Sequence, residues 1–393
     1  QRTVDMVMAG KNPTGDPDVD DIIPAPGTER WHITTSTAEA APHCDVILVT
    51  VPTPITSDLK PDLSYVRSAG IDVFSALRPG SRTVVVLEST VYPGVTAQTW
   101  YPELERLGVK IGVDVEIAYC PERFNPGDPA HGVRQVARVI GCANEEVGQS
   151  LVSLYSRLTE EDVRYVGKLE VAEAAKVIEN TQRDLNIALI NELSMLFNKL
   201  DIDTEEVLKA AESKWNFLPF RPGLVGGHCI GVDPYYLTYK AESIGYHPNI
   251  ILSGRKINDN MGKYVSLELV KEMKKKNINI EGSKILIMGL TFKENCSDIR
   301  NSGVKIVIEE LKKHNCNLDL YDPWANGEEI KKLYGTTPIS KLNHNTYDGV
   351  IIAVAHKNFE DIGEAEILNL CKKNHVIYDL KYLFSKDQVT LRL

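Results

Sequence analysis

Short apolar runs alternate with amphipathic stretches through the first part of the chain. Residues 44–51, 83–88 and 113–119 are nearly continuous in apolar side chains, which is typical of parallel strands buried on both faces. Between them, helical periodicity predicts helices over residues 63–77 and 96–107. This regular alternation of strand and helix predicts a doubly wound α/β domain.

The middle of the chain has a different pattern. Residues 170–200 contain no Gly or Pro and predict one long helix, about 45 Å in length. Lys176, Asn180, Asp184 and Asn191 form a polar line along this otherwise apolar helix. A polar line is costly to bury unless each group has a partner, so it either lines a site or is a solvated stripe. The surrounding alanines and leucines favour a site.

A second α/β unit follows. Residues 284–290, 318–323, 350–355 and 376–379 predict buried strands, with a helix over 304–313. Shorter helices are predicted over 204–213 and from about 258 to 275. The predicted fold is therefore two Rossmann-like doubly wound α/β domains joined by a helical central domain with one long helix.

Polar or proline-rich segments follow three consecutive predicted strands. These segments are Val51-Pro52-Thr53-Pro54, Ser89-Thr90 and Cys120-Pro121-Glu122. Each alone could be an ordinary turn between a strand and a helix. Ligands of doubly wound sheets bind at the carboxyl ends of the strands, so the three segments together indicate a site.

A glycine-rich loop over residues 223–234 carries one thiol, Cys229, with Asp233 four residues later. Glycines allow positive φ and a close approach of backbone to a ligand. Cys229 is either a nucleophile or a small buried core residue, which is the commoner fate of cysteine. His228 is its neighbour in sequence and therefore a poor partner, and a zinc site at these two residues lacks further ligands at metal spacing.

Composition narrows the class of protein. The chain has 393 residues, 43% hydrophobic and 25% charged, as in ordinary globular proteins. A net charge of −10 argues against a nucleic-acid binder, and no apolar run approaches the length of a membrane span. Seven scattered cysteines without pairing rhythm fit free thiols in a reducing cytoplasm.

The candidate residues together suit carbonyl chemistry. A thiolate adds to a carbonyl carbon, a Lys or Asn stabilises the oxyanion, and a carboxylate activates water. Cys229, the Lys176 and Asn180 helix face, Glu122 and Asp233 supply these groups.

Several of these segments match one family in order. The sequence Gly-Gly-His-Cys-Ile-Gly-Val-Asp-Pro at 226–234 resembles the catalytic segment of the nucleotide-sugar 6-dehydrogenases. Further matches are residues 51–54, 88–90, 176–191 and 289–300, so the resemblance spans essentially the whole chain. The Gly-His-Cys-Ile form, with Pro-Glu-Arg-Phe-Asn-Pro-Gly-Asp at 121–128, is similar to the UDP-N-acetylhexosamine branch rather than the UDP-glucose branch.

The resemblance implies a double oxidation of the sugar C6 alcohol to a carboxylate with two NAD. It implies that Cys229 forms a thiohemiacetal and then a thioester, while Lys176 and Asn180 hold the C6 oxygen. Asp233 would position water or act as base, Glu122 would assist hydrolysis, and Thr90 would lie between nicotinamide and substrate.

The resemblance also implies the binding residues and domains. Cofactor contacts are expected from Val51, Pro52, Thr53, Ser89, Thr90 and Arg300. Substrate contacts are expected from Glu122, Arg123, Lys176, Phe217, Arg221, Gly223, Gly226, Arg255, Phe292 and Lys293. The expected domains are an NAD-binding domain over 1–167, a central domain over 168–278 and a UDP-sugar-binding domain over 279–393. A homodimer or higher homo-oligomer is expected.

One departure from the family pattern concerns the start of the chain. The family opens with a strand and a Gly-x-Gly-x-x-Gly turn that holds the pyrophosphate of the dinucleotide, and this sequence has no such turn. We expect the sequence to be part of a longer chain that includes this first βαβ unit. Three alternatives remain: a UDP-glucose 6-dehydrogenase, a nucleotide-sugar-binding protein without NAD-dependent activity, and a single-step hydroxyacid dehydrogenase.

Overall fold

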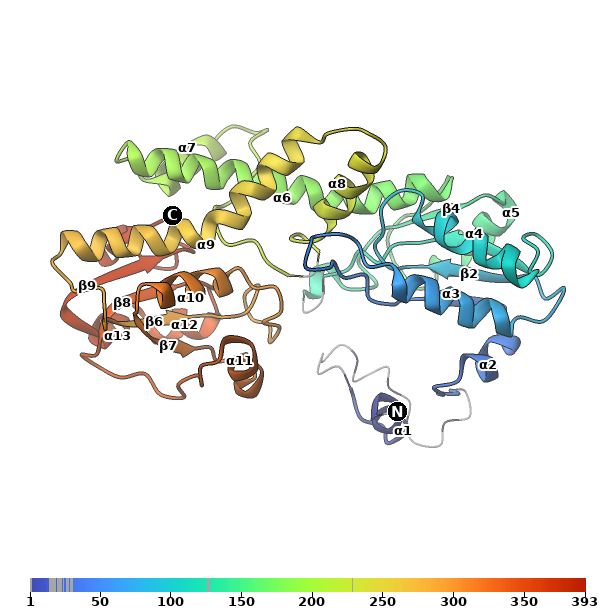
Figure 1. Ribbon diagram of the computed structural model, residues 1–393, viewed down its shortest axis with the longest axis horizontal. Coiled ribbons are helices and arrows are strands. Elements are labelled where there is room, and N and C mark those ends of the chain that lie inside the picture. Colours follow the sequence, from blue (N-terminus) through green and yellow to red (C-terminus); the bar gives the residue numbers. More distant parts are fainter. Residues whose placement is uncertain are drawn as a thin grey trace. The chain divides into compact units, whose positions relative to one another are not determined.

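The computed structural model describes residues 2–13, 19, 23, 25, 28, 31–125, 128–227 and 229–393. Figure 1 shows its helices and strands coloured along the sequence. The chain forms two compact units. The first comprises Gln1–Glu179 and Tyr235–Gly245, and the second comprises Asn180–Pro234 and Tyr246–Leu393.

The first unit contains a five-stranded sheet in the order β1-β2-β3-β4-β5. Neighbouring strands pair in parallel except β3 and β4, which are antiparallel. Val49 of β1 lies opposite Leu87 of β2, so these two strands end side by side. The strands are β1 (Val46–Val49), β2 (Thr83–Leu87), β3 (Val115–Tyr119), β4 (Arg138–Cys142) and β5 (Val163–Gly167).

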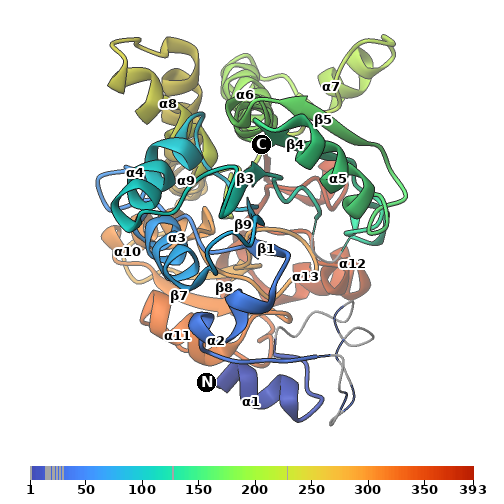
Figure 2. The same ribbon diagram turned by 90° about the vertical axis from the view of Figure 1, so that its right-hand side faces the viewer.

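Helices cover both faces of this sheet (Figure 2). Helices α3 and α4 lie on one side, where Phe74 and Trp100 meet edge to face with ring centroids 5.5 Å apart. Helix α5 lies on the other side and packs Leu151 and Tyr155 against the strands. The helices are α1 (Arg2–Met8), α2 (Thr37–Ala40), α3 (Ser64–Ala76), α4 (Val95–Leu107), α5 (Glu145–Tyr155) and α8 (Asp233–Ser243), with 3₁₀ turns η2 (Ala41–His43) and η3 (Pro129–His131).

The second unit contains a five-stranded parallel sheet in the order β10-β9-β8-β6-β7. Alternate residues of β6 face opposite layers, as the pleat of a strand requires. Ile285 and Ile287 pack with α9 and α10, whereas Leu286 and Met288 pack with α12 and α13. The strands are β6 (Lys284–Met288), β7 (Asn317–Tyr321), β8 (Tyr347–Ile352), β9 (Cys371–Asp379) and β10 (Leu391–Arg392).

Two long helices belong largely to the second unit. Helix α6 runs from Leu169 to Lys199, close to the predicted limits, and α9 runs from Asn249 to Lys275. The other helices are α7 (Thr204–Glu212), α10 (Val304–Lys313), α11 (Gly327–Tyr334), α12 (Lys357–Ile362) and α13 (Glu364–Leu370), with a 3₁₀ turn η4 (Lys386–Gln388). None of the helices in the described part of the chain is long and apolar enough to cross a membrane.

The predicted fold class is confirmed, and three local differences have physical causes. Helix α9 begins nine residues before the predicted 258, because Gly254 lowers helix propensity but lets α6 approach closely. A Cβ at Gly254 would lie 2.4 Å from Leu185. Strand β4 and helix α5 had no prediction; β4 begins with a charged residue, Arg138, and so lacks the continuous apolar run of β2.

Candidate active site

The ends of the first three strands meet at one edge of the first sheet. The Ser89 hydroxyl after β2 donates a 2.6 Å hydrogen bond to the carbonyl of Val51 after β1. The backbone N–H of Glu122 after β3 donates to the carbonyl of Glu88 over 3.3 Å. The three polar segments predicted at strand ends are therefore neighbours, at the edge where doubly wound sheets bind ligands.

The remaining cofactor candidates lie in the same turns. Thr53 and Thr90 are half-buried and Pro52 is exposed. The Tyr236 hydroxyl of α8 donates to the carbonyl of Pro54 over 3.2 Å, which fixes the turn that carries Pro52 and Thr53. Hydroxyl and carbonyl groups at the carboxyl ends of the strands can form hydrogen bonds with the polar groups of a nicotinamide. The types of these residues are therefore compatible with NAD binding.

Glu122 is an unusually placed carboxylate. Its Oε1 atom is buried and has no hydrogen-bond partner among the described residues. Burial raises the pKa of Glu122, and the positive charge of Lys176 on α6 partly counteracts this rise. Lys176 is itself buried, so the two opposite charges interact in a medium that screens them weakly. A carboxyl group whose pKa is raised above its usual value is suited to proton transfer.

A cluster behind Glu122 was not found by sequence reasoning. The Tyr155 hydroxyl of α5 donates to a carboxylate oxygen of Glu88, and the Arg138 guanidinium lies 5.9 Å from the centroid of the Tyr155 ring. Burial raises the pKa of Cys120 to about 12, so this thiol stays protonated. Arg138 had no signal in the sequence, because it begins the strand β4 that no pattern predicted.

Arg123 is bound to α6 rather than left exposed. Its Nη2 atom lies 2.7 Å from Oε1 of Glu179, its Nε atom donates to the other carboxylate oxygen, and its Nη1 atom donates to the carbonyl of Ala137. The guanidinium thus ties the segment after β3 to α6.

Close packing within the second unit explains the glycines before Cys229. A Cβ at Gly226 would lie 2.7 Å from the Asn301 carbonyl oxygen. Gly227 has φ +86° and faces the Phe292 ring, which a Cβ would approach to 2.8 Å. The close approach that the sequence predicted is made here to another loop of the chain, and contact of these glycines with a ligand stays a prediction.

The thiol itself is exposed at a tight turn. The backbone N–H groups of Val232 and Asp233 both donate to the Cys229 carbonyl, at 3.1 and 2.8 Å. Asp233 is buried at the start of α8, and Asn180 Nδ2 donates to its Oδ2 atom over 2.6 Å. Two predicted catalytic residues, Asn180 and Asp233, are therefore in contact. His228, Pro126 and Gly127, named with these motifs, lie outside the described residues.

Three residues of the polar line on α6 (Lys176, Asp184 and Asn191) are buried and Asn180 is half-buried, so the line is not a solvated stripe. Asp184 Oδ1 accepts from Arg255 over 2.6 Å and from Asn258 over 2.7 Å, both on α9. Asn191 donates to the Gly223 carbonyl and accepts from the Gly223 N–H, at 3.1 and 2.8 Å. Asp184 and Asn191 thus fix the positions of α9 and of the start of the glycine-rich loop over residues 223–234.

The cations predicted to contact substrate or cofactor have different neighbours in the structure. Arg221 pairs with Glu205 and Glu212, and Arg300 forms a two-pronged pair with Asp298. Lys293 Nζ lies 5.8 Å from the Phe292 ring centroid.

Two further substrate predictions concern a buried arginine and the loop before Gly223. Arg255 pairs with Asp184 and Asp259 and is buried. Phe217 is half-buried, and its N–H donates to the Lys214 carbonyl over 3.0 Å. The assignments of all these residues to substrate or cofactor remain predictions.

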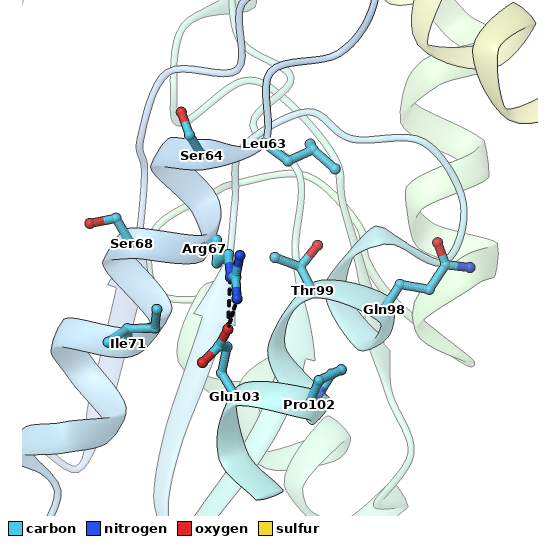
Figure 3. Close-up of a pocket in the computed structure, with 9 residues that line it drawn as sticks. All are labelled: Leu63, Ser64, Arg67, Ser68, Ile71, Gln98, Thr99, Pro102 and Glu103. Carbon is cyan, nitrogen blue, oxygen red and sulfur yellow. Dashed lines mark hydrogen bonds and ion pairs between the residues drawn. The ribbon is translucent and has the colours of Figure 1, made fainter. Parts of the chain in front are cut away.

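A surface pocket between α3 and α4 is unrelated to these candidates (Figure 3). Its volume is about 630 Å³, and none of the predicted site residues lines it. The Arg67 guanidinium within it is paired with Glu103, which also binds Arg106. The charges inside the pocket therefore satisfy one another.

Comparison with known proteins identifies the family. Residues 1–159, 170–260 and 286–386 match the NAD-binding, central and UDP-binding domain models of the UDP-glucose/GDP-mannose dehydrogenase family. The chain is 51% identical over 351 residues to a UDP-N-acetyl-D-glucosamine 6-dehydrogenase of Pseudomonas aeruginosa, covering 89% of this chain and 83% of that protein. It is 49% identical over 360 residues to one of Salmonella typhi, covering 91% and 84%.

A solved structure shows the same fold. The UDP-D-ManNAc dehydrogenase of Pyrococcus horikoshii superposes with a TM-score of 0.85 at 25% identity, covering 100% of this chain and 91% of that one. The predicted family resemblance, enzyme class and NAD cofactor are confirmed. The chain belongs to the UDP-glucose/GDP-mannose dehydrogenase family of NAD-dependent enzymes.

Proposed function

We propose that this protein oxidises the C6 hydroxyl of UDP-N-acetyl-D-glucosamine to a carboxylate. The observation that carries the proposal is Glu122, a half-buried residue with a buried carboxylate oxygen and a raised pKa, which interacts with the positive charge of the buried Lys176. An acid–base group and a cation at the carboxyl edge of the sheet suit an oxidation that ends in hydrolysis. The relatives at 51% and 49% identity bear this activity in their names.

The proposed reaction removes four electrons in two steps. NAD, when bound at Val51–Thr53 and Ser89–Thr90, accepts a hydride in each oxidation. In the first, the C6 alcohol loses a hydride and a proton and becomes an aldehyde. The Cys229 thiolate then bonds to the aldehyde carbon, and the oxygen gains a proton to give a thiohemiacetal.

In the second oxidation the thiohemiacetal loses a hydride and its hydroxyl proton and becomes a thioester. Water then attacks the thioester carbon, the bond to sulfur breaks, and the carboxylate and the thiol are released. Lys176 and Asn180 hold the C6 oxygen throughout. Glu122 removes the proton from water, and Asp233, held by Asn180, orients the groups around the thiol.

The assignment of binding regions follows the family domains. We assign NAD binding to residues 1–167, the thiol loop to a central domain over 168–278 and the uridine diphosphate to residues 279–393. Phe217, Arg221, Gly223 and Gly226 contact the nucleotide from the central loop, while Phe292 and Lys293 contact it from the segment after β6. Arg123, Arg221 and Arg255 are weaker candidates, because their charges already pair with Glu179, with Glu205 and Glu212, and with Asp184.

The gluco epimer is favoured by the gradation of similarity. Relatives named UDP-N-acetyl-D-mannosamine dehydrogenase are only 31–32% identical to this chain over 344–390 residues. The product, an N-acetylated uronate, would enter a surface polysaccharide.

The assembly is proposed to be a cytoplasmic homodimer. Helix α6 carries exposed apolar side chains at helical spacing, namely Ile178, Leu189 and Leu196, and the exposed Leu200 follows directly after the helix. Their spacing places them on one face of the helix. An apolar stripe of this length is suited to pairing with a second copy, and free thiols are suited to a reducing compartment.

The test measures NADH produced per UDP-sugar consumed by the full chain. Two NADH per UDP-N-acetyl-D-glucosamine are expected, with lower kcat/KM for the manno and galacto epimers and for UDP-glucose. One NADH would contradict the double oxidation. UDP-sugar binding without NADH would support a binding protein instead, and faster oxidation of UDP-glucose would contradict the assigned substrate.

A further inference from the structure

Three buried polar side chains meet at the carboxyl edge of the second sheet. Strand β6 lies between β7 and β8, so the strand order changes direction at this point. Open α/β sheets bind ligands in the crevice formed there. Thr291 follows β6, Asp322 follows β7 and His356 follows β8, and all three side chains are buried.

Asp322 collects backbone donors from two loops. Its Oδ2 atom accepts from the N–H groups of Leu290 and Thr291, at 2.6 and 3.3 Å. Its Oδ1 atom accepts from Trp324 and Ala325, at 2.8 and 2.9 Å. The loop after β6 is therefore fastened to the loop after β7 by one carboxylate.

The ring of His356 has a defined tautomer. The Asn295 backbone N–H donates to Nδ1 over 3.0 Å, so the ring proton lies on Nε2. Nε2 is 3.1 Å from Asp322 Oδ2 and 3.2 Å from the Thr291 hydroxyl oxygen. The Thr291 hydroxyl thus accepts from His356 and donates its own proton to the Lys293 carbonyl over 2.8 Å.

The backbone around Lys293 is held from its other side too. Cys296 Sγ donates to the Lys293 carbonyl over 3.4 Å. Asn295 adopts the left-handed conformation, with φ 54°, and its side-chain oxygen accepts from the Lys357 N–H over 3.0 Å. Asparagine tolerates this conformation better than most residues. The conformation of the turn over residues 291–296 is therefore set by its own side chains together with groups of Asp322, His356 and Lys357 outside it.

We propose that His356 and Asp322 are positioning residues that orient Lys293 toward the UDP-sugar. This inference rests on the proposed function, because it takes Lys293 as a substrate contact. The Thr291 hydroxyl links His356 to the Lys293 backbone, because it accepts from His356 and donates to the Lys293 carbonyl. If His356 ceased to donate, Asp322 and Thr291 would each lose a donor. Thr291 would then be free to turn away from the Lys293 carbonyl.

Two substitutions of His356 separate its two ring nitrogens. In His356→Gln the amide nitrogen stands where Nε2 was, so the donor is kept and the acceptor for Asn295 is lost. In His356→Asn the amide oxygen stands where Nδ1 was, so the acceptor is kept and the donor is lost. His344→Gln is the matched control, since His344 pairs with Glu366 on the surface of the same unit.

The first readout is amide hydrogen exchange of residues 291–296 in the full chain without substrate. In His356→Gln the Asn295 amide should exchange about tenfold faster, because it loses one hydrogen bond, while in His356→Asn it should exchange as in the wild type. Equal exchange in both variants would overturn the assigned tautomer. Because no substrate is needed, this result is independent of the proposed function.

The second readout is KM for UDP-N-acetyl-D-glucosamine. His356→Asn and Thr291→Val should raise it about tenfold without changing KM for NAD, and Thr291→Ser should restore the wild-type value. In a Lys293→Met background His356→Asn should cause no further rise, because its effect passes through Lys293. Additive effects of the two substitutions would overturn the proposal, whereas an inactive wild type would contradict only the proposed function.

Discussion

The carboxyl edges of the two sheets bury carboxyl groups in opposite states. At the first sheet, Glu122 keeps a buried oxygen atom without a hydrogen-bond partner among the described residues, and burial raises its pKa. At the second sheet, burial of Asp322 also acts to raise the pKa. There the hydrogen bonds from His356 and the backbone outweigh it, so the pKa of Asp322 is lowered.

The difference between these two carboxyl groups distinguishes a group that can react from a group that holds the fold in place. A buried carboxylate oxygen without a partner costs stability, but its free lone pairs can accept a proton from water. A carboxylate surrounded by donors is stable as the anion and has no capacity left for chemistry. The first edge is thus suited to a reacting group and the second to holding one in place.

The largest expected effect is on catalysis at the first edge. Glu122→Gln should lower kcat by about 10²–10⁴-fold, because the amide cannot take a proton from water. Its stability should not fall, since a neutral amide is easier to bury than a carboxylate. Steady-state kinetics and a denaturant melt measure both.

A matched control is Glu116→Gln on β3, the strand that precedes Glu122. Glu116 is buried but accepts from Asn144 over 2.8 Å, so its substitution should leave kcat unchanged. Comparable losses of kcat in both variants would show that Glu122 has no special role.

The second effect is on stability at the second edge. Asp322→Asn should lower the free energy of unfolding of this unit by about 2–4 kcal/mol, because the amide presents an NH₂ group to backbone donors. Hydrogen exchange of β6 and β8 measures the loss. A change below about 1 kcal/mol would contradict the role of Asp322 as the fastening group.

The third prediction uses pH to separate the two edges. The raised pKa of Glu122 places the rise of kcat with pH above the ordinary range of glutamate, and protonation of Glu122 favours the folded state. The lowered pKa of Asp322 contributes stability that is complete above the ordinary aspartate pKa and lost as pH falls through the lowered value.

On acidification, activity should therefore fall at a higher pH than the structure of the second unit. Parallel measurements of kcat and circular dichroism test this order. The fall of kcat on acidification should be absent in Glu122→Gln. Simultaneous loss of activity and structure in the wild type would contradict the contrast between the two sheet edges.

The smallest effect concerns the cluster behind Glu122. Tyr155→Phe removes the hydroxyl that donates to Glu88 and should cost about 1 kcal/mol of stability. We expect a few-fold loss of kcat as well, because Glu88 is linked through its backbone to Glu122. Thermal melts and steady-state kinetics measure the two effects.

Tyr165→Phe is the control for this step. Its hydroxyl donates to the Cys142 carbonyl over 2.8 Å in the same unit. It should cost similar stability without changing kcat. Equal kcat in the two variants would separate Tyr155 from the function of Glu122.

Much of the fold could be predicted, because buried strands and long helices leave local patterns. The run at 83–88 and the Gly- and Pro-free stretch at 170–200 became β2 and α6 nearly as predicted. Strand β4 could not be predicted, because its pairing with β3 and β5 rather than its own pattern makes it a strand.

The residues of the candidate site also divide into those that local sequence could predict and those that it could not. Glu122 and Lys176 could be selected from sequence by residue type and by position on a predicted strand end or helix. The roles of Asp184 and Asn191 could not, because their partners Arg255 and Gly223 are distant in sequence. The glycines before Cys229 were rightly predicted to allow a close approach, but the group approached was not predictable.

The sequence by itself determined the class of fold, the family and the residues at the strand ends, because periodicity and motif spacing are local properties. Only the tertiary structure decided which buried charges have partners. Among the residues that the structure describes, it left an oxygen of Glu122 without one and surrounded Asp322 with donors from separate loops. The pKa of a carboxyl group depends on the atoms around it, and chain folding brings those atoms from distant positions.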